Sequence, residues 1–173
     1  MDIAIIGVKY CEETAKLIKE NYCDVNIDII NLTSEKFSKP CADMYIITDR
    51  LCAGLKLKPD MYINMLNDLM KNIRKDDIAL INFDDENLIR HLSGLDCNII
   101  SYGFNLKSTV TLSGTEEDIF TGQIYYTCSL QRSIKTIDKN DLEPCEMKLL
   151  ISDQYNQQSI LAYCAFCFAA NLI

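Results

Sequence analysis

The sequence predicts an α/β fold, in which a mostly parallel, doubly wound sheet with flanking helices carries a small antiparallel sheet. Up to about residue 104, short apolar runs alternate with helical stretches, an order typical of parallel strands joined by helices. From about residue 108 to residue 151, polar and apolar residues alternate without an intervening helix, which is typical of antiparallel strands. The 173 residues are enough for one core, so we expect a single domain spanning 1–173 with a β appendage at about 108–151.

The first half of the chain is expected to supply the parallel strands. The run DIAIIG at 2–7 is apolar and ends in glycine, which favours a buried parallel strand. Residues 12–22 follow with apolar side chains at helical spacing. Further strands are expected at 25–32, 42–49, 76–85 and 97–104, and further helices at 58–73 and 86–95.

The second half is expected to supply the antiparallel strands and the last helix. The alternating stretches are STVTLSG at 108–114, DIFTGQIYYTCSL at 118–130 and CEMKLLIS at 145–152. The chain closes with NQQSILAYCAFCFAANLI at 156–173, an apolar helical stretch. No internal repeat, low-complexity tract or long linker divides the sequence.

Composition excludes several classes of function. The net charge of −8 disfavours nucleic acid and anionic membranes as partners. No run approaches the ~18 apolar residues of a membrane span, and Asp2 stands where a signal peptide would carry positive charge. We therefore expect a cytoplasmic protein.

The nine cysteines are scattered along the chain, and we expect them to be reduced, metal-free and mostly buried. Only Cys164 and Cys167 form a C-x-x-C pair, which has no second ligand pair. His91 is the sole histidine, so it offers little to a mixed zinc site or a histidine-dependent nucleophile. Adjacent carboxylates occur at 76–77, 84–85 and 116–118; they could bind a cation, but we interpret them as solvated turns.

The stretch from 79 to 114 resembles a specific family. A strand ends in N-x-D-D, a helix follows, and the next strand ends in an aromatic-glycine turn before alternating strands begin. The last helix carries Ala162 in an alanine-rich part. The N-x-D-D residues are Asn82, Phe83, Asp84 and Asp85, and the turn residues are Tyr102, Gly103 and Phe104. This pattern resembles the ATP-binding central domain of the Mur ligases and folylpolyglutamate synthases, and we expect the N- and C-terminal ligase domains to be absent.

That resemblance implies an ATP-dependent carboxylate–amine ligase, whose phosphate loop reads G-x-x-G-K-T/S. Aligned from Gly7, this chain has Tyr10 at the second glycine, Cys11 at the lysine and Glu12 at the threonine. Tyrosine restricts the backbone, cysteine brings no cation, and glutamate places a negative charge beside the triphosphate position. We interpret GVKYCEET at 7–14 as the remains of a phosphate loop, kept as a strand-to-helix turn.

The other positions that the family uses for metal, phosphate or adenine also differ here. The magnesium-binding glutamate corresponds to Asn31, a metal-contributing histidine to Gly54, and a carbamylated lysine, counted from Tyr62, to Leu66. In the last helix the histidine and the two asparagines correspond to Gln154, Tyr155 and Gln158. We therefore assign no catalytic, cofactor-binding or metal-binding residues and expect no cofactor.

Three functions remain open at this stage. The first is a catalytically inactive domain that acts through binding, regulation or assembly, as a homodimer or with a partner protein. The second is a nucleotide or small-molecule sensor that uses the old ATP cleft. The third is an ATP-dependent amide ligase subunit completed by another chain; only the last two would involve ATP and magnesium.

Overall fold

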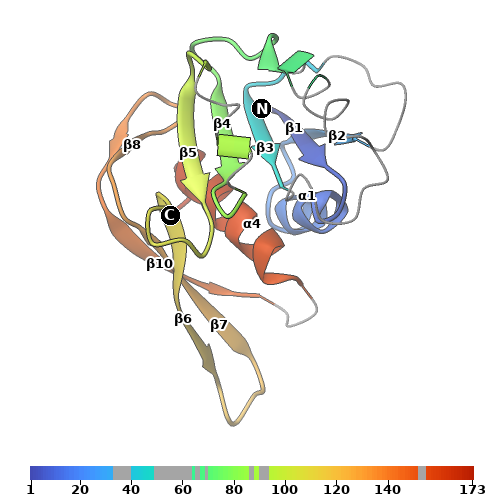
Figure 1. The fold of residues 1–173 in the computed structure, drawn as a ribbon. Helices are drawn as coiled ribbons and strands as arrows, with labels where there is room; N and C mark the ends of the chain where they lie inside the picture. Colours follow the sequence, from blue (N-terminus) through green and yellow to red (C-terminus); the bar gives the residue numbers. More distant parts are fainter. Residues whose placement is uncertain are drawn as a thin grey trace.

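The computed structural model describes residues 1–32, 40–48, 64, 67–68, 70–85, 88–89, 94–151 and 155–173. Its centre is an eight-stranded sheet with the order β10-β7-β6-β5-β4-β3-β1-β2, accompanied by a two-stranded β8-β9 sheet (Figure 1). The strands are β1 (Asp2–Gly7), β2 (Asn26–Asn31), β3 (Met44–Ile47), β4 (Ile78–Asn82), β5 (Asn98–Tyr102), β6 (Val110–Glu117), β7 (Ile124–Leu130), β8 (Ile134–Lys135), β9 (Asp141–Leu142) and β10 (Cys145–Leu150). The helices named here are α1 (Cys11–Asn21) and α4 (Gln157–Ala169).

The sheet is parallel from β2 to β6 and antiparallel beyond β6, which confirms the predicted fold class. The antiparallel strands are attached to the parallel ones through β6, which pairs in parallel with β5 at Tyr102 and Val110 and so continues the main sheet. The distal part of the β6–β7 hairpin projects from the body of the domain (Figure 1).

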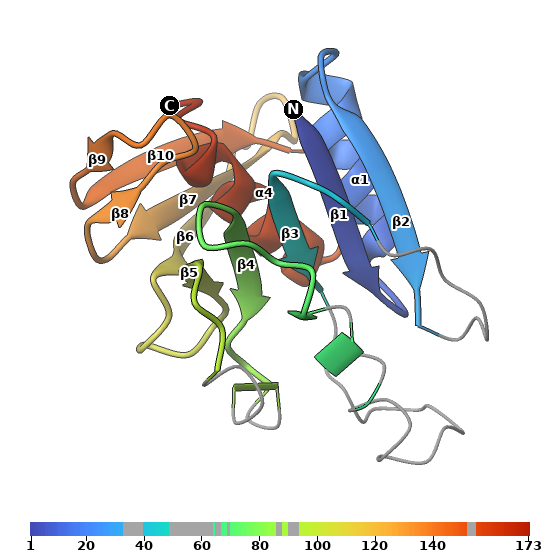
Figure 2. The ribbon, with the colours of Figure 1, turned by 90° about the horizontal axis from the view of Figure 1, so that it is seen from above.

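Alternate residues of the parallel strands serve two cores. Ile3 and Ile5 of β1 face α1 and α4, which both lie on one side of the sheet (Figure 2). Ala4 and Ile6 face the other side, where they pack in a cluster with Met70 and Leu88. Burial on both faces explains why the interior strands β1, β3 and β4 are almost entirely apolar. The predicted helices at 58–73 and 86–95 lie mostly outside the described residues.

Helix α4 is apolar on every side because it is buried on every side. All residues from Ser159 to Ala169 are buried, and Leu161, Phe166 and Phe168 belong to the same core cluster as β1, β5 and β7. The helix begins after Asn156, whose side chain accepts a hydrogen bond from the Gln158 backbone N–H at 2.9 Å. Among the described helices, none has the length and apolar character needed to cross a membrane.

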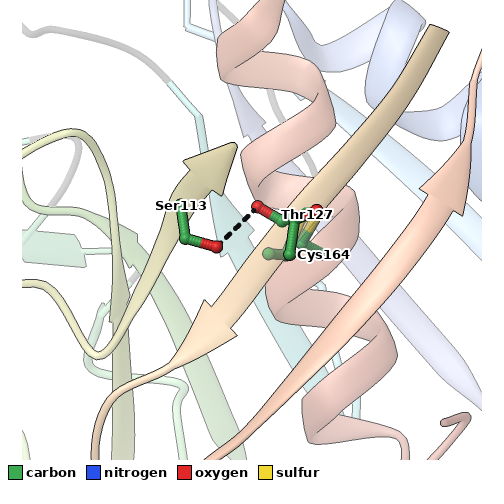
Figure 3. The surroundings of a disulfide bond; sticks show 4 residues. Ser113, Thr127 and Cys164 are labelled. Atoms are coloured by element: carbon green, nitrogen blue, oxygen red, sulfur yellow. Dashed lines mark hydrogen bonds between the residues drawn. A yellow bond between two sulfur atoms is a disulfide. The ribbon is translucent and has the colours of Figure 1, made fainter. Parts of the chain in front are cut away.

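One pair of cysteines corrects the expectation that all are reduced, since Cys128 of β7 and Cys164 of α4 form a disulfide (Figure 3). Their Cα atoms lie 6.5 Å apart, within the range that a disulfide spans. Packing of α4 against β7 brings these cysteines together across 36 positions, which their spacing in the sequence could not reveal.

Figure 3 also shows the Ser113 hydroxyl donating to the Thr127 carbonyl at 3.2 Å, beside the β6–β7 register shift. Burial raises the pKa of the free Cys167 thiol to about 12, so it stays protonated at neutral pH.

Candidate functional site

The topology places the candidate site where β1 and β3 end. β1 pairs with β2 on one side and with β3 on the other, so the order in which successive strands are added to the sheet reverses at β1. The gap between β1 and β3 is therefore the topological switch point of the sheet. Ligands of doubly wound sheets bind in the crevice at the carboxyl ends of such strands. We call the segments after β1, β3, β4 and β5, together with the start of α4, the carboxyl edge.

The loop from Gly7 to Cys11 turns directly from β1 into α1. Tyr10 is the N-cap residue of α1 but makes no capping hydrogen bond through its side chain. The Cys11 thiol is buried, and its Sγ lies 3.3 Å from Oγ1 of Thr48, the residue that follows β3. Thr48 Oγ1 donates in turn to the Ile6 carbonyl at 3.4 Å. The thiol therefore joins β3 to α1 from inside the fold. A hollow of about 420 Å³ lies outside this loop.

Glu13, in the first turn of α1, connects the two helices. One of its carboxylate oxygens accepts hydrogen bonds from the Asn156 backbone N–H at 3.1 Å and from the Ser159 hydroxyl at 2.8 Å. The amino end of α4 is electropositive and leaves donors unsatisfied, so a carboxylate stabilises it. Glu12, its neighbour, is exposed. The start of α4 thus already has an anion from the chain itself.

Three polar side chains close the gap between β4 and α4. Asn82 Nδ2 donates to Gln158 Oε1 at 2.9 Å and to the Thr48 carbonyl at 3.2 Å. Gln158 Nε2 donates to Asp84 Oδ2 at 3.0 Å. Asn82 Oδ1 accepts from the Asp84 backbone N–H at 3.0 Å. These bonds link residues 74 and 76 positions apart and satisfy the amide groups of Asn82 and Gln158 within the protein.

Asp84 also holds the turn after β5. Its two carboxylate oxygens accept hydrogen bonds from the backbone N–H groups of Phe104 and Asn105, each at 3.0 Å. Gly103 has φ of +155°. A Cβ built there would lie 2.8 Å from Asp84 Oδ1, so the carboxylate occupies the space that a side chain would need. Asp84 is therefore a structural anchor of the edge.

Comparison with known proteins identifies the family. A sequence model described as the Mur ligase middle domain matches residues 58–167. The chain belongs to this family. A comparison with curated proteins gave no match.

Solved structures agree with the Mur ligase fold. The UDP-N-acetylmuramoylalanyl-D-glutamyl-2,6-diaminopimelate–D-alanyl-D-alanyl ligase from Acinetobacter baumannii aligns with a TM-score of 0.65 at 12% identity, covering 98% of this chain and 43% of the ligase. The MurF ligase from Thermotoga maritima, solved in complex with ADP, aligns with a TM-score of 0.58 at 12% identity, covering 99% of this chain and 45% of that protein. The chain thus spans less than half the length of these ligases.

Some positions singled out in this Mur ligase middle domain lie on the carboxyl edge, and others do not belong to its described part. Gly54, Tyr62, Leu66, His91 and Gln154 fall outside the described residues. Asn31 is exposed at the end of β2.

Tyr155 turns toward α1, where its hydroxyl donates to Glu20 Oε2 at 2.7 Å and its ring lies 5.3 Å from Lys16 Nζ. Burial raises the pKa of Tyr155, and the hydrogen bond with Tyr155 raises the pKa of Lys16, so both keep their protons at neutral pH.

The interpretation of the paired carboxylates as solvated turns is wrong for two pairs. Asp77 is buried and accepts hydrogen bonds from the Arg74 backbone and guanidinium, which closes the turn before β4. Asp85 is buried and accepts from the Leu88 N–H at 3.3 Å. Asp118 is exposed but caps its own hairpin loop, where bonds from the Phe120 and Thr121 N–H groups lower its pKa. No group of three metal-ligating side chains occurs within the described segments.

Sequence reasoning missed Glu13 and Thr48 as members of this edge. Nothing in the family pattern pointed to Glu13, and the partners of both residues lie far away along the chain. A weak signal existed for Glu13, because a carboxylate in the first turn of a helix is common and can serve a second helix nearby. Thr48 follows a buried strand at the switch point, a position from which a side chain reaches the crevice.

Proposed function

We propose that this Mur ligase middle domain does not turn over ATP and acts instead through binding, as a homodimer or with a partner protein. The observation that carries this proposal is that the polar groups of the carboxyl edge bind one another. Glu13 occupies the amino end of α4, and Asp84 binds the 104–105 backbone and Gln158. A bound triphosphate would have to compete with these contacts.

Electrostatics support the same proposal. Phosphate loops hold the triphosphate with backbone N–H groups and a lysine, and they use a hydroxyl to bind magnesium. Here Tyr10, Cys11 and Glu12 stand at the corresponding positions, and Glu12 and Glu13 bring two carboxylates to the first turn of α1. A carboxylate and a phosphate oxygen that each carry one negative charge and lie ~5 Å apart repel by about 3 kcal/mol at an effective dielectric constant of about 20. These carboxylates therefore oppose the binding of a triphosphate at this loop.

Titration calorimetry with ATP and magnesium tests the catalytic half of the proposal. We expect no binding at millimolar ATP and no phosphate release. Replacing Tyr10 by glycine, Cys11 by lysine and Glu12 by threonine together should not create an ATPase, because Glu13, Asp84 and Gln158 stay in place. A dissociation constant below about 100 μM that substitutions within residues 7–14 abolish would contradict the proposal and favour a nucleotide sensor. Phosphate release that requires a second protein would favour the ligase subunit.

Exposed apolar side chains support the assembly half. Leu106, in the loop that Asp84 anchors, is 84% exposed, and Phe104 beside it is 46% exposed. Large apolar groups clustered on a surface often mark interaction sites, and a two-fold dimer is the commonest way to cover them.

Light scattering coupled to gel filtration tests assembly. At ~100 μM protein, where even weak dimers form, we expect twice the monomer mass. Leu106→Asp should shift the protein toward monomer, because a charge would then enter the covered surface. Leu150→Asp is the matched control, since Leu150 is exposed in β10 away from this loop. A monomer at this concentration that also coprecipitates no protein from its own cell extract would overturn this half of the proposal.

A further inference from the structure

A second pocket lies at the opposite end of the domain from the carboxyl edge. It is formed by the carboxyl ends of α1 and α4, the turn between α1 and β2, and the segment around Ile137. Its volume is about 350 Å³, near the lower limit for pockets that bind small molecules. We call it the amino-edge pocket, because β1 and β3 begin on this side.

The walls of the pocket are apolar and already ordered. The rings of Tyr22 and Phe166 meet edge to face with their centroids 5.6 Å apart, and Phe166 is fully buried. The backbone N–H of Ile137 donates to the Ala169 carbonyl at 2.8 Å, and that of Leu172 donates to the Cys167 carbonyl at 2.9 Å. These bonds hold the lining segments of Ile137 and Leu172 in place, so a ligand would enter a preformed space.

The rim of the pocket is negatively charged. Asp24 and Asp138 are exposed lining residues, and neither makes a hydrogen bond or ion pair with the described residues. Lys139, next to Asp138, pairs instead with Asp76 at 3.6 Å. Among the lining residues, the α-amino group of Met1 is the one cation, so the two carboxylates leave a net negative charge. The ends of α1 and α4 add the negative ends of two helix dipoles.

We propose that the amino-edge pocket binds a small organic cation, namely an amine with an aryl or alkyl body. The apolar body packs against Tyr22 and Leu172, with Phe166 behind Tyr22, and the ammonium group lies at the rim near Asp24 and Asp138. The aromatic ring favours the apolar body of such a ligand by contact, and the rim carboxylates attract its ammonium group. This site is independent of the proposed function, because none of its lining residues belongs to the carboxyl edge.

Three phenylalkyl probes of similar size and different charge test the ligand class. The probes are 2-phenylethylamine, the neutral 2-phenylethanol and the anionic 3-phenylpropanoate, each titrated into the ¹⁵N-labelled full chain. We expect the amine to shift the amide signals of Tyr22, Val25 and Leu172 saturably in the millimolar range, about tenfold more tightly than 3-phenylpropanoate. Bound amine should also slow alkylation of the exposed Cys23 at the rim and leave the exposed Cys41, which lies outside the pocket, unchanged.

Two sets of variants keep the proposal falsifiable. Asp24→Asn with Asp138→Asn should reduce amine affinity about fivefold and equalise the three probes, because both substitutions are on the surface and remove only charge. Glu117→Gln, on the distal hairpin, removes one charge elsewhere and should change nothing. Ala170→Phe should abolish binding by filling the pocket. Equal affinity for amine and carboxylate in the unmodified chain, or no saturable shift, would overturn the proposal, whatever the ATP titration shows.

Discussion

Replacing Phe168 by alanine is expected to lower the free energy of unfolding by about 3–5 kcal/mol. Phe168 is completely buried in α4 within the main core cluster, so the substitution removes a large apolar contact area and leaves a cavity that the surrounding strands cannot fill. Urea denaturation followed by circular dichroism measures the loss. For a domain of this size, it corresponds to a decrease in Tm of about 6–20 °C.

The matched control for this variant is Phe120→Ala. Phe120 lies in the β6–β7 hairpin loop and is 99% exposed, so its removal should change the free energy of unfolding by less than about 0.5 kcal/mol. Equal effects of the two substitutions would contradict the position of α4 inside the fold.

Gly103→Ala is expected to destabilise the protein by about 2–3 kcal/mol. The new Cβ would lie 2.8 Å from Asp84 Oδ1, and a backbone φ of +155° is unfavourable for alanine. Moving Asp84 would break its bonds to Phe104, Asn105 and Gln158. Thermal unfolding and urea denaturation of the variant give the magnitude.

A double-mutant cycle separates the two causes of this effect. In an Asp84→Ala background, Gly103→Ala should destabilise by only about 1 kcal/mol, because the backbone strain remains and the contact with the carboxylate is gone. Gly114→Ala is the control, since a Cβ there would meet only ordinary contacts at 3.9 Å. An unchanged effect of Gly103→Ala in the Asp84→Ala background would show that the carboxylate is not the obstacle.

The described parallel strands could be predicted because each leaves a local signature. In β1, Ile3 and Ile5 are buried on one face of the sheet, and Ala4 and Ile6 are buried on the other. A strand that is buried on both faces needs an uninterrupted apolar run, which is visible in the sequence. The place of β6 could not be predicted in the same way. The alternation of polar and apolar residues indicates which side chains face a core, but it does not indicate which strand is the hydrogen-bonded neighbour. In the structure, β6 joins the main sheet through a single residue pair, Tyr102 with Val110.

The candidate site shows the same limit more strongly. The N-x-D-D and aromatic-glycine motifs led to Asn82, Asp84 and Gly103, which do lie at the carboxyl edge. Their roles depend on Gln158 and on the 104–105 backbone, and Glu13 reaches α4 across more than 140 positions. A motif specifies neighbours along the chain, whereas hydrogen bonds between distant segments depend on how the elements pack.

Helix α4 has a consequence for synthesis on the ribosome. It follows all ten described strands in the sequence, yet it packs against α1 and against the central strands β4, β5, β6 and β7 (Figure 1). Until residues 157–169 have left the exit tunnel, the part of the apolar face that α4 covers stays exposed, because α1 covers only the β1–β2 side. At a typical ~5–20 residues per second, the nascent chain would expose that face for seconds, during which chaperones can bind it. Folding of this domain therefore waits for its last helix to emerge.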